Sequence, residues 1–99
     1  MPSEMAATPL PELILYTRAG CGLCDEARAM IQVLLEDRAM RGARVAHFHE
    51  RDIAGDPAIE RELFDRIPVV EIRGKRLELA ISATKLRRFI DDALDGALV

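Results

Sequence analysis

The sequence predicts a single α/β domain in which helices flank a mixed four-stranded sheet, in the order β-α-β-α-β-β-α. Two observations support this prediction. Residues 13–16 form a short continuous apolar run, which is typical of a strand buried on both faces. Directly after it, from residue 23, apolar residues recur with a helical period. A strand that leads into a helix and then into another strand forms a unit with parallel strands. The 99 residues suffice for one domain but not for two.

The first half of the chain is assigned from these two patterns. Residues 1–12 contain three prolines and are predicted to form a disordered or loosely docked tail, so the folded domain is assigned to residues 13–99. The first helix is expected to end near Gly42. Residues 45–50 alternate between apolar and polar side chains and predict the second strand. The apolar stripe of the first helix consists of Leu23, Ala27, Met30, Ile31, Leu34 and Leu35.

The second half supplies the remaining elements. Asp56 followed by Pro57 is typical of a helix start, with an N-cap and a proline at the first helical position. Residues 67–72 and 76–80 predict two strands joined by a tight glycine turn. Ser82 is expected to cap the last helix. A hairpin and a covering helix therefore complete the sheet.

Composition and charge exclude several classes of protein. Hydrophobic residues make up 49% and charged residues 31% of the chain, which is a globular profile. The formal net charge of −3 gives no reason to expect nucleic-acid binding, and no apolar run approaches the roughly 20 residues that a membrane helix needs. The first residues lack the basic region and apolar core of a secretory signal. We therefore expect a cytoplasmic monomer that binds neither nucleic acid nor membrane, in a compartment where structural disulfides are rare.

The two cysteines, Cys21 and Cys24, lie on the turn between the first strand and the first helix. A structural disulfide is disfavoured, because closing so short a loop stabilises a protein by about 2 kcal/mol, against about 4 kcal/mol or more for a loop of around 70 residues. Residues three apart on a helix lie about 5 to 6 Å apart, so a disulfide can form and break there with little backbone movement. The pair is therefore interpreted as redox-active.

The start of a helix favours the thiolate of Cys21. Unpaired backbone N–H groups and the positive end of the helix dipole lie there, and such sites lower a cysteine pKa below the reference value of about 8.5. Cys24, one turn further in, is expected to be less exposed. We assign Cys21 as the nucleophile and Cys24 as the resolving thiol. Arg18 is a candidate to add positive charge near Cys21, the alternative being an ordinary solvated cation.

Two segments, LYTRAGCGLCDEA at 15–27 and RIPVVEIRGKRL at 66–77, resemble the glutaredoxin branch of the thioredoxin-like superfamily. The resemblance implies a thioredoxin-like fold over residues 13–95 and thiol–disulfide oxidoreductase activity on protein disulfides or mixed disulfides. It also implies that Pro68 is cis and faces the disulfide, and that the backbone of Ile67 pairs with an extended substrate chain. Proline fits a strand start, because X–Pro is the only bond for which the cis form costs little.

The sequence departs from this family in several places. Leu15 and Gly20 stand where thioredoxins have a buried aspartate and a tryptophan. Glutaredoxins bind glutathione through a Thr-Val-Pro turn and a Gly-Gly-x-x-Asp segment, whereas this chain has Arg-Ile-Pro at 66–68 and Ala-Ile-Ser-Ala-Thr at 80–84. Half of the glutathione site is missing from the pattern. The electron donor is therefore left open between glutathione and a thioredoxin-type reductase, and no other cofactor is expected.

His47 and His49 raise a metal-binding alternative. Two cysteines and two histidines can bind zinc tetrahedrally. Zinc-finger histidines usually stand three to five residues apart on a helix, whereas these two share one face of a predicted strand and have no reason to reach the cysteines. No metal site is therefore assigned. Two alternatives stay open. One is a metal or iron–sulfur cluster shared between two chains. The other is a non-catalytic interaction module with this fold, against which the presence of both cysteines argues.

Overall fold

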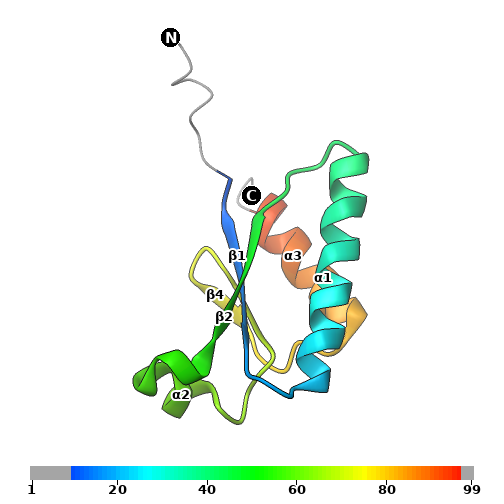
Figure 1. Cartoon of the computed structure of the whole chain (residues 1–99). Helices are drawn as coiled ribbons and strands as arrows, with labels where there is room; N and C mark the ends of the chain where they lie inside the picture. Colours follow the sequence, from blue (N-terminus) through cyan, green and yellow to red (C-terminus); the bar gives the residue numbers. More distant parts are fainter. Residues whose placement is uncertain (1–9, 97–99) are drawn as a thin grey trace.

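The computed structural model describes residues 10–96 and contains one four-stranded sheet with the strand order β2-β1-β3-β4 (Figure 1). Strand β1 (Glu12–Thr17) is parallel to β2 (His47–Asp52). Strand β3 (Val69–Ile72) is antiparallel both to β1 and to β4 (Lys75–Leu77). The mixed sheet predicted from the sequence is confirmed.

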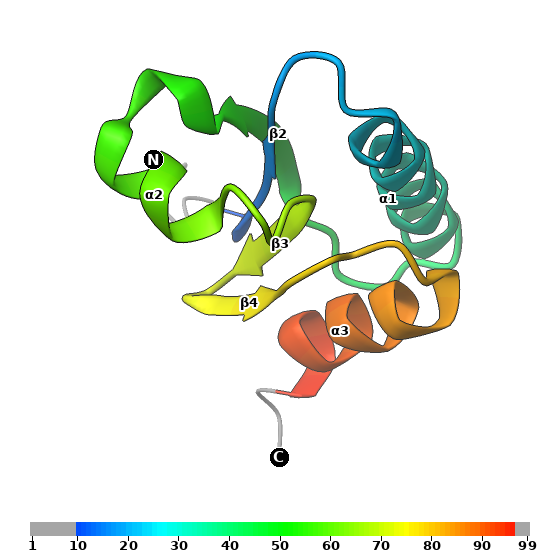
Figure 2. The same cartoon turned by 90° about the horizontal axis from the view of Figure 1, so that it is seen from below.

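Helices cover both faces of the sheet. Helices α1 (Gly22–Met40) and α3 (Ala83–Asp95) lie on one face, and α2 (Pro57–Leu63) lies on the other (Figure 2). A short 3-10 helix, Ile53–Gly55, leads from β2 toward α2. Within the described part of the chain, no helix is both long and apolar enough to cross a membrane. The order of strands and α-helices is the predicted β-α-β-α-β-β-α.

The side chains of β1 alternate between two hydrophobic cores. Leu13 and Leu15 are fully buried against α1 and α3, and Ile14 and Tyr16 pack on the α2 side. Each fully buried leucine contributes about 1.5 to 3 kcal/mol relative to an exposed one. The larger core is completed by Ala27, Ile31, Leu34, Val70, Ile72, Leu86, Ile90 and Leu94. Because both faces of β1 are covered along most of its length, its four central residues, 13–16, form an unbroken apolar run.

Side-chain caps start helices α2 and α3 at the predicted residues. The Asp56 carboxylate accepts hydrogen bonds from the N–H groups of Ala58 at 3.0 Å and Ile59 at 3.3 Å. The Ser82 hydroxyl accepts from the N–H of Lys85 at 3.2 Å. Each cap satisfies N–H groups that the first turn of a helix leaves without a partner.

The pairing of β1 with β2 starts and ends differently from the prediction. Strand β1 begins at Glu12, inside the segment assigned to the tail, and the carbonyl of Pro11 accepts a hydrogen bond from His47 at 2.8 Å. Strand β2 accordingly starts two residues later than expected, because parallel pairing with β1 fixes its register. The rest of the predicted tail, residues 1–9, lies outside the described residues.

The hairpin of β3 and β4 is shorter than predicted. Strand β3 starts two residues late because Pro68 has no N–H to donate to the ladder. Arg73 and Gly74 form the turn with φ angles of 53° and 79°, and positive φ at both positions suits a two-residue hairpin turn. Strand β4 ends early because Leu79, at φ 50°, turns the chain out of the extended conformation.

Arg38 joins α1 to α3 and is a buried charge that sequence reasoning did not single out. Its side chain is 3% exposed and donates hydrogen bonds to Asp91 and Asp95 of α3, and its Nε donates to the carbonyl of Arg44. The planar guanidinium donates to these three acceptors from three different nitrogens in a fixed geometry, whereas an ammonium group would donate from a single nitrogen. The hydrogen bond from Arg38 holds the pKa of the Asp95 carboxyl below its ordinary value.

Replacing Arg38 by methionine should lower the free energy of unfolding by about 2 to 3 kcal/mol, because charge-assisted hydrogen bonds between two helices are lost. Chemical denaturation measures the change. Arg41→Ala is the matched control, since it removes an exposed ion pair with Asp37 on the same helix and should cost less than about 1 kcal/mol. Equal losses in the two variants would contradict the role of Arg38.

Acid should weaken the same connection. Because the folded-state pKa of Asp95 lies below the unfolded value of about 3.9, the stabilisation is fully present above that pH and is lost as the pH falls through the folded-state pKa. The free energy of unfolding should therefore fall more steeply between about pH 4 and pH 2 in the parent protein than in Arg38→Met. Denaturant titrations across this range give the comparison, and identical profiles would rule out stabilisation of Asp95 by Arg38.

Candidate active site

The end of β1 and the start of α1 bring both cysteines to one end of the sheet. After Thr17 the chain reverses through a short turn in which Gly20 has a φ of 77°, a conformation that residues with a side chain rarely adopt. Cys21 follows as the N-cap residue of α1. In Figure 1 this turn lies at the lower end of the molecule, together with the segments that lead into β3 and α3.

Cys21 and Cys24 are joined by a disulfide, with their Cα atoms 5.2 Å apart. The backbone N–H of Cys24 donates a hydrogen bond to the Sγ atom of Cys21 at 3.1 Å. The sulfur thus occupies the place that a serine or aspartate oxygen takes in an ordinary N-cap. In the reduced state the same N–H group and the positive end of the α1 dipole would favour negative charge on this sulfur.

The two cysteines differ in exposure. Cys24 is 1% exposed, whereas Cys21 is half-buried. Cys21 is therefore the more accessible of the two from solvent. Leu23, which lies between them, is 46% exposed, and its predicted place in the buried stripe is wrong. The buried face of α1 is centred on Cys24, Ala27 and Ile31, so Leu23 lies at its edge.

The segment that enters β3 presents free backbone groups. The Ile67–Pro68 peptide bond is cis, as the resemblance implied. The carbonyls of Arg66 and Pro68 accept hydrogen bonds from Leu79 at 2.9 Å and Ala80 at 2.8 Å. Between these two residues, the backbone N–H and carbonyl of Ile67 form no backbone hydrogen bond within residues 10–96.

Arg18 directly follows the last residue of β1, three residues before Cys21, and already has a partner. Its guanidinium forms an ion pair with Glu60 of α2 at 3.7 Å and is 46% exposed. Part of its charge is therefore neutralised by α2, and its support of the Cys21 thiolate stays a prediction.

Four exposed apolar side chains belong to segments at this end of the sheet, and sequence reasoning missed their exposure. Leu23, Phe64, Leu79 and Ile81 are 46%, 55%, 53% and 48% exposed, and we call them the apolar rim. They lie at the start of α1, at the end of α2 and on the segment between β4 and α3. Periodicity assigns apolar residues to the core, so only the folded arrangement reveals that these four are exposed.

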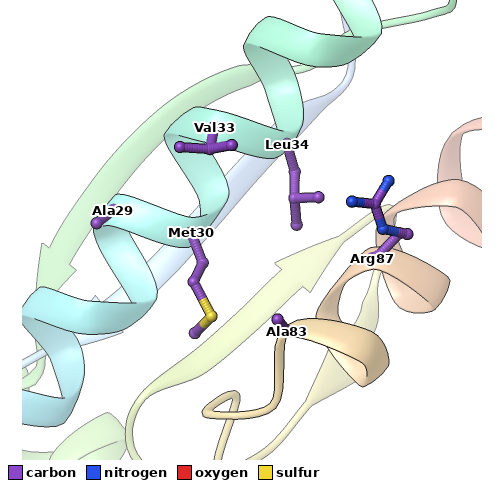
Figure 3. A pocket seen from close by; sticks show the side chains of 6 residues that line it. All are labelled: Ala29, Met30, Val33, Leu34, Ala83 and Arg87. Atoms are coloured by element: carbon purple, nitrogen blue, oxygen red, sulfur yellow. The ribbon is translucent and has the colours of Figure 1, made fainter.

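A separate pocket of about 290 Å³ opens between α1 and α3 (Figure 3). Met30 and Leu34 point from α1 toward α3, and Arg87 borders the opening from α3. The lining is completed by Ala29, Val33 and Ala83. None of these residues belongs to the predicted site, so the pocket is distinct from the cysteine turn.

The histidines lie far from the cysteines. His47 pairs with Glu12 at the start of β1, whereas Cys21 follows the other end of that six-residue strand. At about 3.3 Å per residue, the strand separates the two by roughly 17 Å. These two cysteines and two histidines therefore cannot bind one zinc ion, and the Cys₂His₂ alternative is excluded.

Comparison with known proteins agrees with this architecture. The family model described as Glutaredoxin-like domain (DUF836) matches residues 12–93, so the chain belongs to this family. The crystal structure of the structural genomics target protein XcR50 from X. campestris is 32% identical, covers 82% of this chain and 97% of its own, and has a TM-score of 0.66. Protein Ne2328 from Nitrosomonas europaea is 25% identical over 93% of this chain and 94% of its own, with a TM-score of 0.60.

A thioredoxin shares the fold at a lower level of identity. Oxidized mitochondrial thioredoxin 3 from Saccharomyces cerevisiae is 18% identical over 90% of this chain and 84% of its own, with a TM-score of 0.58. The thioredoxin-like fold implied by the sequence is therefore confirmed. A search of curated proteins finds no match.

The difference in exposure should appear as a difference in thiol reactivity. In the reduced protein at neutral pH, Cys21 should be alkylated about tenfold faster than Cys24 or more, because one unit of pKa changes the thiolate fraction tenfold. Mass spectrometry of partially alkylated protein measures both rates. Titrating the rate for Cys21 against pH should give a pKa below about 8.5. Equal rates at the two sites would refute the assignment of nucleophile and resolving thiol.

Proposed function

We propose that this domain is a thiol–disulfide oxidoreductase that cycles the Cys21–Cys24 pair between dithiol and disulfide. The observation that supports this most directly is the position of the disulfide. Its Cys21 sulfur caps α1 and is accessible, while Cys24 is buried. Membership of the glutaredoxin-like family and the cis Pro68 beside the turn support the same reaction.

In the reducing direction, the Cys21 thiolate attacks one sulfur of a substrate disulfide and forms a mixed disulfide with it. The other substrate sulfur leaves as a thiolate and takes up a proton. Cys24 then loses its proton and attacks the Cys21 sulfur. The mixed disulfide breaks, the second substrate thiolate leaves, and the Cys21–Cys24 bond closes. The substrate has gained two electrons, and a donor thiol must return two electrons to the protein.

The surroundings of the disulfide suit a polypeptide substrate. The free backbone groups of Ile67 can pair with an extended chain in the manner of an added strand. The apolar rim offers side-chain contacts around the same position. We therefore infer that protein disulfides or mixed disulfides on proteins are the substrates.

Glutathione is proposed to be a poor donor. Arg18 can pair with one of the two carboxylates of glutathione. Ala80 and Ile81, however, carry side chains at the positions of the two glycines of the glutaredoxin Gly-Gly-x-x-Asp segment. The Ser82 hydroxyl is already used as the cap of α3, and residues 80–84 contain no carboxylate for the amino group of glutathione. Losing a charge-assisted contact costs about 1.5 to 3 kcal/mol, or roughly 10- to 150-fold in affinity.

We propose instead that another thiol protein, such as a thioredoxin-type reductase system, supplies the electrons. A reducing compartment such as the cytoplasm would contain these donors and keep the pair cycling. In this proposal the chain acts as a monomer, because the reaction needs only its own two cysteines.

A reduction assay on the oxidised protein tests the donor. Glutathione should reduce the Cys21–Cys24 bond at least about tenfold less efficiently than it reduces a glutaredoxin with the intact Gly-Gly-x-x-Asp segment. The reason is that this chain lacks the charge-assisted contact to the amino group of glutathione. A thioredoxin reductase system is run in parallel. Cys21→Ser should abolish turnover, and Cys24→Ser should accumulate the mixed disulfide. Reduction by glutathione at the rate of the reference glutaredoxin would overturn the proposed donor.

Removing the charge of Arg18 should slow the reaction, and releasing Arg18 from its ion pair should speed it. Arg18→Ala should slow reduction about two- to fivefold, the range expected for one exposed charge, and added salt should narrow the gap. Glu60→Gln should speed the reaction, because it releases Arg18 from its ion pair. Arg41→Ala, at the far end of α1, is the charge-matched control. If Arg18→Ala and Arg41→Ala have the same rate, Arg18 takes no part in the reaction.

A further inference from the structure

A second group of chemically active side chains lies at the opposite end of β1. Glu12 is paired in register with His47 of β2, and His49 stands two residues further along the same strand. Side chains two apart on a strand share a face, and so do paired residues on neighbouring strands. One carboxylate oxygen and one ring nitrogen from each histidine all lie within 4.8 Å of one another.

The contacts within this group already bring ligand atoms together. His49 Nε2 lies 2.9 Å from an oxygen of Glu12. The ring centroids of His47 and His49 are 4.8 Å apart, with 34° between the ring planes. The side chains of His49 and Glu12 are 41% and 58% exposed, so small rotations about their side-chain bonds can bring the donor atoms closer.

The backbone beneath the group is held firmly, although its side chains are free to adjust. All six residues of β1 are paired in register with β2, and β2 is an edge strand of the sheet. By alternation along β1, Glu12 lies on the same sheet face as Ile14 and Tyr16, and α2 lies only at the other end of the sheet (Figure 1). A shallow pocket of about 210 Å³, lined by Glu12, Ile14, His49, Glu50 and Arg51, opens beside it. The positive charge of Arg51 is matched by an ion pair with Asp56 at 3.2 Å.

We propose that Glu12, His47 and His49 form a binding site for a divalent transition-metal ion of the zinc type. Two imidazole nitrogens and one carboxylate oxygen form the three-ligand set that zinc accepts with a fourth position left open. Calcium and magnesium prefer sites made only of oxygen ligands, so this donor set selects against them. The fourth position faces solvent, since the group lies on the exposed part of the sheet.

All three residues are needed for this inference. An ion pair between Glu12 and His49 alone would explain why these two side chains lie together but would give His47 no role. Exposed pairs of that kind contribute little to stability. A metal ion uses all three donors and holds the first residue of β1 to the edge strand β2. Binding should therefore stabilise the folded state, because the unfolded chain does not hold these ligands together.

Zinc titration of the full-length, metal-stripped, oxidised protein tests the site. In this form the two cysteines are joined as a disulfide and cannot act as zinc ligands. Isothermal calorimetry with Zn²⁺ should give one ion per chain, and Mg²⁺ should give no binding. Thermal denaturation should show a transition temperature that rises with Zn²⁺ concentration. His47→Gln, His49→Gln and Glu12→Gln should each weaken binding about tenfold or more, at least as much as the loss of an outer-shell partner.

Glu50→Gln is the matched control. It removes the same charge one residue from His49. Glu50 borders the neighbouring pocket, but both oxygens of its carboxylate are bonded to Arg28 of α1 on the other sheet face, so the zinc affinity of this variant should equal that of the parent. A Cys21→Ser, Cys24→Ser double variant should also bind Zn²⁺ as the parent does. The proposal would be overturned if all three ligand variants bound Zn²⁺ as tightly as the parent protein does. Loss of Zn²⁺ binding in the cysteine variant, or no binding to the parent at millimolar Zn²⁺, would also overturn it. None of these readouts depends on the redox reaction.

Discussion

Strand β1 imposes the constraint on which the rest of the structure depends. It is hydrogen-bonded to β2 along one edge and to β3 along the other, and Leu13, Leu15 and Tyr16 are at most 3% exposed. A strand held on both edges and both faces cannot shift by one residue without reversing its side chains between two cores. The point at which it ends is therefore fixed. The cysteine turn and the start of α1 follow directly, so their position is set by the same pairing.

The two ends of β1 differ because the helices cover them unequally. Helix α2 has seven residues and is about 10 Å long, shorter than the strand it packs against. It covers the end of the sheet near the cysteine turn, where it supplies Glu60 to Arg18. The other end of that face is open, and there polar side chains replace apolar ones. The cysteine pair therefore follows one end of β1, whereas at the other end Glu12 of β1 and the two histidines of β2 form an exposed group of oxygen and nitrogen donors.

Local sequence signals predicted what depends on local geometry. Patterns within a few residues were enough to place Cys21 and Cys24 at the junction of a strand and a helix. Such patterns also predicted the caps at Asp56 and Ser82 and the order of the elements. The start of β2 was misplaced because it is set by pairing with β1, which is distant in the sequence. For the same reason the partner of Arg18 and the grouping of Glu12 with the histidines could not be predicted. Leu23 lies at the edge of the apolar stripe of α1, and periodicity alone does not tell whether a residue at that edge is buried. Its exposure is therefore seen only in the folded structure.

The central claim is that the Cys21–Cys24 bond is a reversible redox couple and not a structural link. Its most direct test is an equilibrium titration in thiol redox buffers, with the oxidised fraction read from the mass of alkylated protein. We expect a single two-electron transition, with a tenfold change in the equilibrium constant per roughly 30 mV, at a potential above about −300 mV. The reduced protein should keep its fold. A bond that resists reduction down to potentials below about −300 mV, as structural disulfides do, or a fold lost on reduction, would contradict the claim.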